Sequence, residues 1–240
     1  MKEEKQKLSE FIMFEKAPYQ KLDVRNSMEI NTIGAKEREK LYGPAFTTTF
    51  IKYARNAISK NLKNGSMPED IKTLDQLKEY LISISEKLSI PPFEILLGAQ
   101  FATEKKFEGS LAAGTKLMYR GVTKRVEESD DNMKQPQKAD VDKILAKLRQ
   151  LAVRMKIAPI EFGYRKNEDE SVDILHGGCF YFNGCKKAAD YGLLKRSDGK
   201  IMCGSTMYVC QFLKMGTGYE WDYSVLKFSE PQCIMRCYMV

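Results

Sequence analysis

The sequence predicts an α+β protein with a helical N-terminal half and strands gathered toward the C-terminus. Between about residues 44 and 152, apolar residues recur at spacings of three and four, which is typical of amphipathic helices. After Lys156 the spacing changes to alternation, with Ile160, Phe162 and Tyr164 on one side of a strand. A chain of 240 residues fits one large domain, or one domain with a helical N-terminal extension.

The N-terminal region is expected to be mainly helical. An amphipathic piece around Phe11 ends at Pro18, and partial alternation over residues 22–33 suggests a strand. Pro44 suits the first turn of a helix, and Thr73 suits a helix N-cap. From the apolar spacing, helices are predicted over residues 44–62, 73–88, 93–108 and 111–126.

The C-terminal half is expected to mix helices with strands. A polar stretch at residues 127–138, which contains Pro136, forms a linker or an exposed loop. Asp140 caps the next helix, and turns are expected at residues 167–170 and 229–231. Helices are predicted over residues 140–152, 180–194 and 203–215, and strands over residues 160–165, 172–176, 219–228 and 233–240.

Composition and charge narrow the functional classes. The formal net charge is +7, but acidic residues are interleaved with the lysines, so the one-signed stripe typical of nucleic-acid binding is missing. No apolar run approaches the ~18–20 residues of a membrane helix. The charged N-terminus lacks the apolar stretch of a secretory signal. We therefore expect a cytoplasmic protein that binds neither nucleic acid nor membrane, and whose cysteines are thiols or metal ligands.

All six cysteines follow His176, the only histidine of the chain. Soft ligands gathered in one segment of a reduced protein favour zinc, which tolerates irregular ligand spacing. Cys233 and Cys237 share one face of the last predicted strand but lie about 13 Å apart by strand rise, so a shared ion requires a bend. Buried thiols without a metal are an equal alternative, and an iron-sulfur cluster is a further one. The candidate zinc ligands are Cys203, Cys210, Glu230, Cys233 and Cys237.

A second functional class is a thiol- or metal-dependent enzyme. Cys179 and Cys185 flank an aromatic run and follow His176-Gly177-Gly178. A helix that begins near Cys179 would lower the pKa of its thiol, and a nucleophilic pair with His176 is then conceivable. A lone histidine is more often a partly buried, hydrogen-bonded side chain than a base, so catalysis ranks as the alternative.

Aromatic residues are dense in the C-terminal half and suggest a ligand pocket. Such residues more often belong to the core, and a pocket is favoured only where several of them surround a cavity with a few polar groups. An apolar or aromatic ligand is expected to contact Phe162, Tyr181, Tyr208, Trp221 and Tyr223.

The order of strands and helices, ending in a cysteine-bearing hairpin, resembles the 4-vinyl reductase domain family. These hydrocarbon-binding domains are distantly related to the TRAPP vesicle-tethering subunits. The resemblance covers residues 111–240. It is most specific at Ser229-Glu230-Pro231-Gln232-Cys233, which matches the family's turn and following cysteine. Cys203 resembles the family's upstream cysteine.

Two domains are expected: a mainly helical region over residues 1–110, from the apolar spacing, and a ligand-binding α/β domain over residues 111–240, which the resemblance implies. The resemblance implies a twisted antiparallel sheet packed against helices, with a small hydrophobic ligand held near residues 111–126. It also implies a zinc ion bound by cysteines and one carboxylate. We therefore expect a sensor or carrier of a small hydrophobic or aromatic molecule. A homodimeric assembly module, like the tethering subunits, is an alternative.

Overall fold

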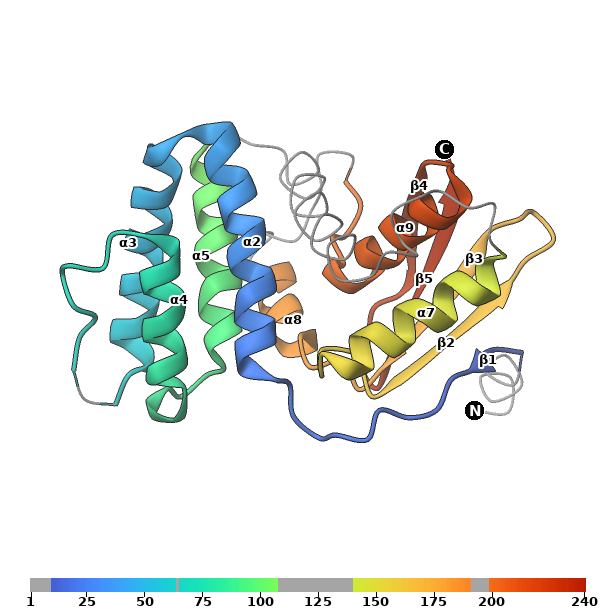
Figure 1. Cartoon of the computed structure of the whole chain (residues 1–240), viewed down its shortest axis with the longest axis horizontal. Coiled ribbons are helices and arrows are strands. Elements are labelled where there is room, and N and C mark those ends of the chain that lie inside the picture. Colours follow the sequence, from blue (N-terminus) through green and yellow to red (C-terminus); the bar gives the residue numbers. More distant parts are fainter. Residues whose placement is uncertain (1–9, 64, 108–139, 191–198) are drawn as a thin grey trace. The chain divides into compact units, whose positions relative to one another are not determined.

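The sheet and most of the helices belong to two separate units of the chain. The structure, a computed structural model, describes residues 10–63, 65–107, 140–190 and 199–240 (Figure 1). Within these ranges, a sheet unit contains residues 10–22, 140–182 and 203–240, and a helical unit contains residues 23–63, 65–107, 183–190 and 199–202. The fold class is α+β, as predicted. Each unit is built from non-contiguous segments, whereas the sequence suggested one boundary near residue 110, a position outside the described residues.

The helical unit contains four helices that are adjacent in the sequence. They are α2 (Val24–Tyr42), α3 (Pro44–Asn61), α4 (Leu74–Ser83) and α5 (Pro92–Lys106), with the short 3-10 helix η1 (Ser85–Lys87) after α4. Thr73 caps α4 as predicted, because its hydroxyl accepts a hydrogen bond from the Gln76 amide while the Gln76 side chain accepts one from the Thr73 amide. Apolar spacing therefore predicted α3, α4 and α5 correctly, although α4 is shorter than expected.

Helix α2 replaces the strand predicted over residues 22–33, and that prediction was wrong. Asp23 is the N-cap, and its carboxylate accepts a hydrogen bond from the Asn26 amide at 2.9 Å. Met28, Ala35 and Arg38 are all buried on the helix. Because Arg38 occupies a core position, the apolar stripe is incomplete and the helical period is hard to see in the sequence.

The sheet unit is built around an antiparallel sheet with strand order β1-β2-β3-β5-β4. Helix α7 (Val141–Arg154) packs against α9 (Gly204–Thr217), and both lie over one face of the sheet (Figure 1). This face is called the inner face below, and the opposite one the outer face. The strands are β1 (Ile12–Met13), β2 (Glu161–Lys166), β3 (Val172–Gly177), β4 (Trp221–Lys227) and β5 (Gln232–Met239). The four longer strands confirm the predicted ones to within two residues at each end.

Strand register determines which side chains share a face. Phe162, His176 and Cys233 are direct neighbours across β2, β3 and β5, and all three are buried on the inner face. Because side chains alternate along a strand, Glu161, Leu175 and Gln232 belong to the outer face. The cysteines of β5 therefore face the helices, and the outer face holds a different set of groups.

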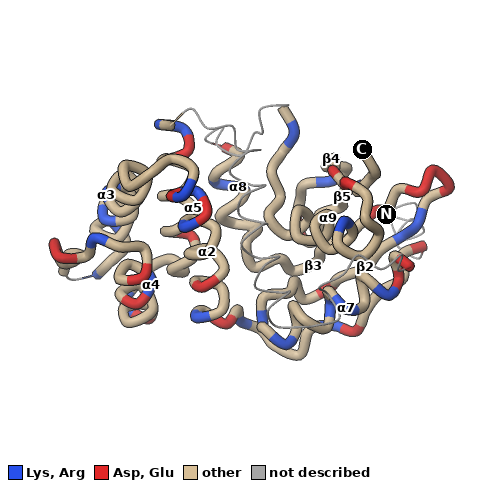
Figure 2. Tube along the Cα trace, turned by 45° about the horizontal axis from the view of Figure 1, so that its top comes forward, with Lys and Arg blue, Asp and Glu red and all other residues tan. Residues whose placement is uncertain are grey.

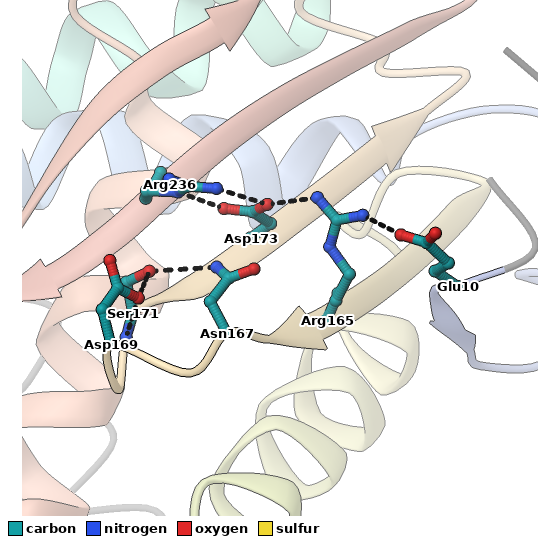
Figure 3. A network of polar contacts seen from close by, with 7 residues as sticks. All are labelled: Glu10, Arg165, Asn167, Asp169, Ser171, Asp173 and Arg236. Carbon is teal, nitrogen blue, oxygen red and sulfur yellow. Dashed lines mark hydrogen bonds and ion pairs between the residues drawn. The ribbon is translucent and has the colours of Figure 1, made fainter. Parts of the chain in front are cut away.

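The outer face carries a buried carboxylate between two arginines (Figure 3). Asp173 is fully buried, and it accepts hydrogen bonds from Arg236 Nε at 2.7 Å and Arg165 Nη2 at 2.7 Å. Burial acts to raise the pKa of Asp173, but the bonds from Arg236 and Arg165 outweigh it and hold the pKa below the usual value. Arg165 also pairs with Glu10, which ties the N-terminal segment to β2.

Charges of both signs occur on the helices and strands of each unit (Figure 2). Several pair with each other, such as Lys36 with Asp75 at 2.7 Å and Lys166 with Asp142 at 2.8 Å. Within the described ranges, no helix has the length and the apolar character that a membrane span requires.

Candidate thiol centre

The sheet unit contains every cysteine except Cys185, which lies on α8 (Phe182–Asp190) in the helical unit. None of the six cysteines forms a disulfide bond. Helix α9 is the element that brings thiols from separate segments together, because it lies over the sheet with Cys203 at its N-cap and Cys210 two turns later.

The closest pair of thiols joins α9 to β5. Cys210 Sγ and Cys237 Sγ are 3.7 Å apart, and both side chains are buried. Thr206, one helical turn before Cys210, lies beside His176 on β3, with Thr206 Oγ1 3.4 Å from His176 Nε2. Thr206 and Cys210, four residues apart on one face of α9, thus contact two different sets of cross-strand neighbours in the sheet.

Cys203 lies at the start of α9 and packs with Cys179 and Cys233. Its amide donates a hydrogen bond to the Tyr223 hydroxyl at 2.7 Å, which fixes the start of α9 against β4. Its sulfur accepts a hydrogen bond from Thr206 Oγ1 at 3.2 Å. Buried aromatic and hydroxyl groups therefore hold the Cys203 backbone and sulfur in place.

The thiols affect one another's protonation. Burial, and then the charge of a Cys203 thiolate, raise the pKa of Cys179 to about 12. Burial is also the largest cause of the raised pKa of Cys203, and Cys210 adds to it. Burial raises the pKa of Cys237 well above the usual value, and Cys210 and Cys203 raise it further. These thiols are protonated at neutral pH, so a metal ion that binds them must displace protons.

The structure divides the five predicted zinc ligands into two groups. Cys210 and Cys237 form one pair, whereas Cys203 packs with Cys233 and Cys179. Cys233 and Cys237 share one face of β5, as predicted, and this is the buried inner face, where Cys233 pairs with His176 and Cys237 with Val172. Glu230 is exposed at the turn before β5. In the described part of the chain, no three histidine, cysteine or acidic side chains are already arranged to hold a metal ion.

The geometry around His176 does not favour a nucleophilic pair. His176 is 3% exposed, and burial, with the charge of Arg149 as a smaller cause, lowers its pKa to about 4. The expected lowering of the Cys179 pKa is wrong, because α8 begins only at Phe182 and burial raises the pKa of this thiol. Cys185 belongs to the helical unit, and His176 and Cys179 to the sheet unit.

We expect slow alkylation of Cys179 in the native protein. Iodoacetamide reacts with the thiolate, and a thiol with a pKa of about 12 is almost entirely protonated near pH 7. Peptide mapping by mass spectrometry after timed labelling measures the rate at each cysteine. Labelling after denaturation is the control and should modify all six. Fast native labelling of Cys179 would contradict its raised pKa and restore the enzymatic alternative.

The five aromatic residues predicted to contact a ligand lie in the sheet unit, and three of them are buried in its core. Phe162 stacks on Phe14 with ring centroids 5.6 Å apart, and Trp221 Nε1 donates a hydrogen bond to Thr217 Oγ1 at 3.0 Å. The Tyr223 hydroxyl holds the Cys203 amide, while Tyr181 and Tyr208 are half-buried. The helix predicted at residues 111–126, the expected second wall of the ligand site, lies outside the described residues.

An open pocket that was not predicted lies on the outer face of the sheet. Its volume is about 310 Å³, and it is lined by Met13, Phe14, Lys16, Glu161, Leu175 and Gln232. None of the five predicted ligand residues is among them. The available signal in the sequence was the pair Gly163 and Gly177, which leave outer-face positions of β2 and β3 without side chains.

Comparisons with protein-family models, with curated proteins and with solved structures find no match for this chain. The resemblance to the 4-vinyl reductase domain stays a prediction that depends on the element order and on the residues around Cys203 and Cys233.

Proposed function

We propose that the sheet unit is the zinc-binding domain of a sensor or carrier protein, with Cys210 and Cys237 as the first two ligands. The observation that supports this most is the distance of 3.7 Å between their sulfur atoms. Zinc–sulfur bonds of about 2.3 Å at the tetrahedral angle separate two sulfur ligands by about 3.8 Å. A zinc ion could therefore bind this pair with little movement of either side chain.

Cys203 is the third ligand in this proposal. Its charge is a smaller cause of the raised pKa of Cys237, after burial and Cys210, and its side chain packs beside Cys233. Because Cys203 lies two helical turns before Cys210, about 10 Å by helix rise, the start of α9 must move as well as the Cys203 side chain for three thiolates to bind one ion. Cys233 is four residues from Cys237 on the same strand, and Glu230 is exposed, so neither is well placed as the fourth. The fourth position is left to water or to an atom of a bound molecule.

Zinc at this site would link α9 to β5 and stabilise the sheet unit. Because the thiols must lose their protons when they bind zinc, affinity should rise with pH. The apolar ligand and the homodimer that the resemblance implies stay predictions beside this site.

We expect about one zinc ion per chain in protein purified without oxygen. The double variant Cys210→Ser/Cys237→Ser should lose that zinc, since it removes both sulfurs of the closest pair. Chelation should lower the melting temperature of the wild type and leave that of the double variant unchanged. Elemental analysis and a thermal melt measure the two effects.

Cys185→Ser is the matched control, because this cysteine lies in the helical unit and should not affect zinc content. Wild-type protein that holds no zinc, and in which all six cysteines titrate as thiols, would overturn the proposal. Iron with inorganic sulfide in place of zinc would also overturn it and would indicate electron transfer.

A further inference from the structure

The open pocket on the outer face lies where β2 and β3 carry glycines and an apolar side chain forms the floor. A Cβ atom at Gly177 would lie 2.6 Å from Glu161 Oε2, and one at Gly163 would lie 2.4 Å from Met13 Sδ. Side chains at these two positions would therefore push Glu161 and Met13 out of their places. Leu175, which is buried between the two glycines on this face, forms the floor of the pocket.

The N-terminal segment is a fixed wall of this pocket. The Phe14 amide donates to the Phe162 carbonyl at 3.0 Å, and the Ala17 amide donates to the Ile160 carbonyl at 2.8 Å. Between these two bonds, Arg149 Nη2 donates to the carbonyl of Glu15 at 2.7 Å. Three hydrogen bonds within four residues hold the backbone that presents Met13 and Lys16, so the pocket is preformed.

The polar groups of the pocket form a chain in which Lys16 and Gln232 both donate to Glu161. Both carboxylate oxygens of Glu161 are engaged, Oε1 by Lys16 Nζ at 2.6 Å and Oε2 by Gln232 Nε2 at 3.2 Å. The bond from Lys16, and then that from Gln232, lower the pKa of Glu161, so it is ionised and its charge is compensated. The Lys16 side chain is 74% exposed, and its ammonium group keeps two protons to donate beside the one that Glu161 accepts.

We propose that this pocket binds small carboxylates with a flat or branched apolar body. The body lies against Met13 and Leu175, and the carboxylate accepts a hydrogen bond from Lys16 Nζ. The two arginines farther along the same face pair with Asp173 and do not line the pocket, whereas Lys16 lines it and keeps its bond to Glu161 (Figure 3). This pocket and the thiols lie on opposite faces of the sheet. A test of carboxylate binding is therefore independent of the proposed zinc site.

Three probes that share one ring and differ in charge test this proposal. Benzoate, benzyl alcohol and benzylamine are titrated into the full chain, with binding followed by saturation-transfer NMR. Benzoate should bind most tightly and benzylamine least. Lys16→Met keeps the aliphatic stem and removes the charge, so it should weaken benzoate about threefold to fivefold, the effect of one exposed charge pair. It should leave benzyl alcohol unchanged.

Two further variants fix the location of the site. Lys21→Met removes an exposed lysine of the same N-terminal segment that does not line the pocket, and it should bind benzoate like the wild type. Met13→Ala removes part of the apolar wall and should weaken all three probes. The proposal is overturned if benzylamine binds as tightly as benzoate. Equal weakening by Lys16→Met and Lys21→Met would also overturn it, because the effect would then be one of overall charge.

Discussion

Replacing Arg38 with methionine should lower the free energy of unfolding of the helical unit by about 3–5 kcal/mol. Arg38 on α2 forms an ion pair with Glu104 on α5, and neither side chain is more than 1% exposed. The variant leaves the carboxylate of Glu104 buried without its counter-charge. Urea unfolding followed by far-UV circular dichroism measures the loss, because the helices of this unit dominate the signal.

The loss should depend on pH in a direction that Glu104 determines. Burial already raises the pKa of Glu104 above its usual value, although the charge and hydrogen bond of Arg38 act to lower it. Without Arg38 the folded-state pKa rises further. The folded chain then binds a proton that the unfolded chain releases near pH 4.5, so stability falls as the pH rises through that interval. Arg38→Met should therefore be less destabilising at pH 5 than at pH 7.

Two comparisons separate the buried charge from other effects of the substitution. Arg38→Met/Glu104→Leu replaces both partners with apolar side chains and should recover most of the lost stability. Arg25→Met, on the same helix, removes an exposed arginine that lies 3.5 Å from Glu79, and it should cost less than about 1 kcal/mol. If Arg38→Met costs no more than Arg25→Met, the buried pair does not hold α2 against α5.

The helices with a continuous apolar stripe could be predicted from the sequence, and α2 could not. In α3, Phe46, Phe50 and Ala54 follow one another at spacings of four and are all buried. In α2, Arg38 occupies a core position because its partner, Glu104, arrives from a helix 66 residues away. The spacing of apolar residues within one helix gives no information about such a distant partner. Arg38 therefore looks like an interruption of the apolar stripe of α2.

The gathering of the cysteines was predictable, but their pairing was not. Alternation along β5 correctly placed Cys233 and Cys237 on one face. The partner of Cys237 depends on how α9 is rotated over the sheet, which is determined by Thr206 against His176 and by Tyr223 at the start of the helix. These contacts join residues 20 and 30 positions apart, beyond any local period.

The outer-face pocket was missed for a related reason. Its wall is β1, a strand of only two residues, which pairs with β2 more than 140 positions later in the chain. A strand this short has no readable alternation. In the sequence, only the glycines of β2 and β3 indicated that other groups come close to the sheet at this place.

Lowering the pH from 7 to 4 should destabilise the sheet unit by about 3 kcal/mol through His176 alone. Burial holds the pKa of this histidine near 4 in the folded chain, against 6.5 for an ordinary histidine. Between these two values the unfolded chain is protonated and the folded chain is not, so the unfolded state binds more protons and stability falls as the pH falls. At about 1.4 kcal/mol per pKa unit, a difference of about 2.5 units gives this magnitude. Below pH 4 this contribution should stop growing.

Because His176 is the only histidine, both the cause and the effect can be measured directly. Proton NMR of the folded protein should show one imidazole resonance that titrates near pH 4. Urea unfolding at a series of pH values, compared with His176→Gln, isolates the histidine from carboxylates such as Asp173 that also lose stability in acid. The two stability curves should converge as the pH falls from 6.5 to 4, since the glutamine variant has no imidazole to protonate when it unfolds. An imidazole that titrates near pH 6.5, or curves that stay parallel, would show that His176 is accessible to water and not packed beneath Thr206 and Phe162.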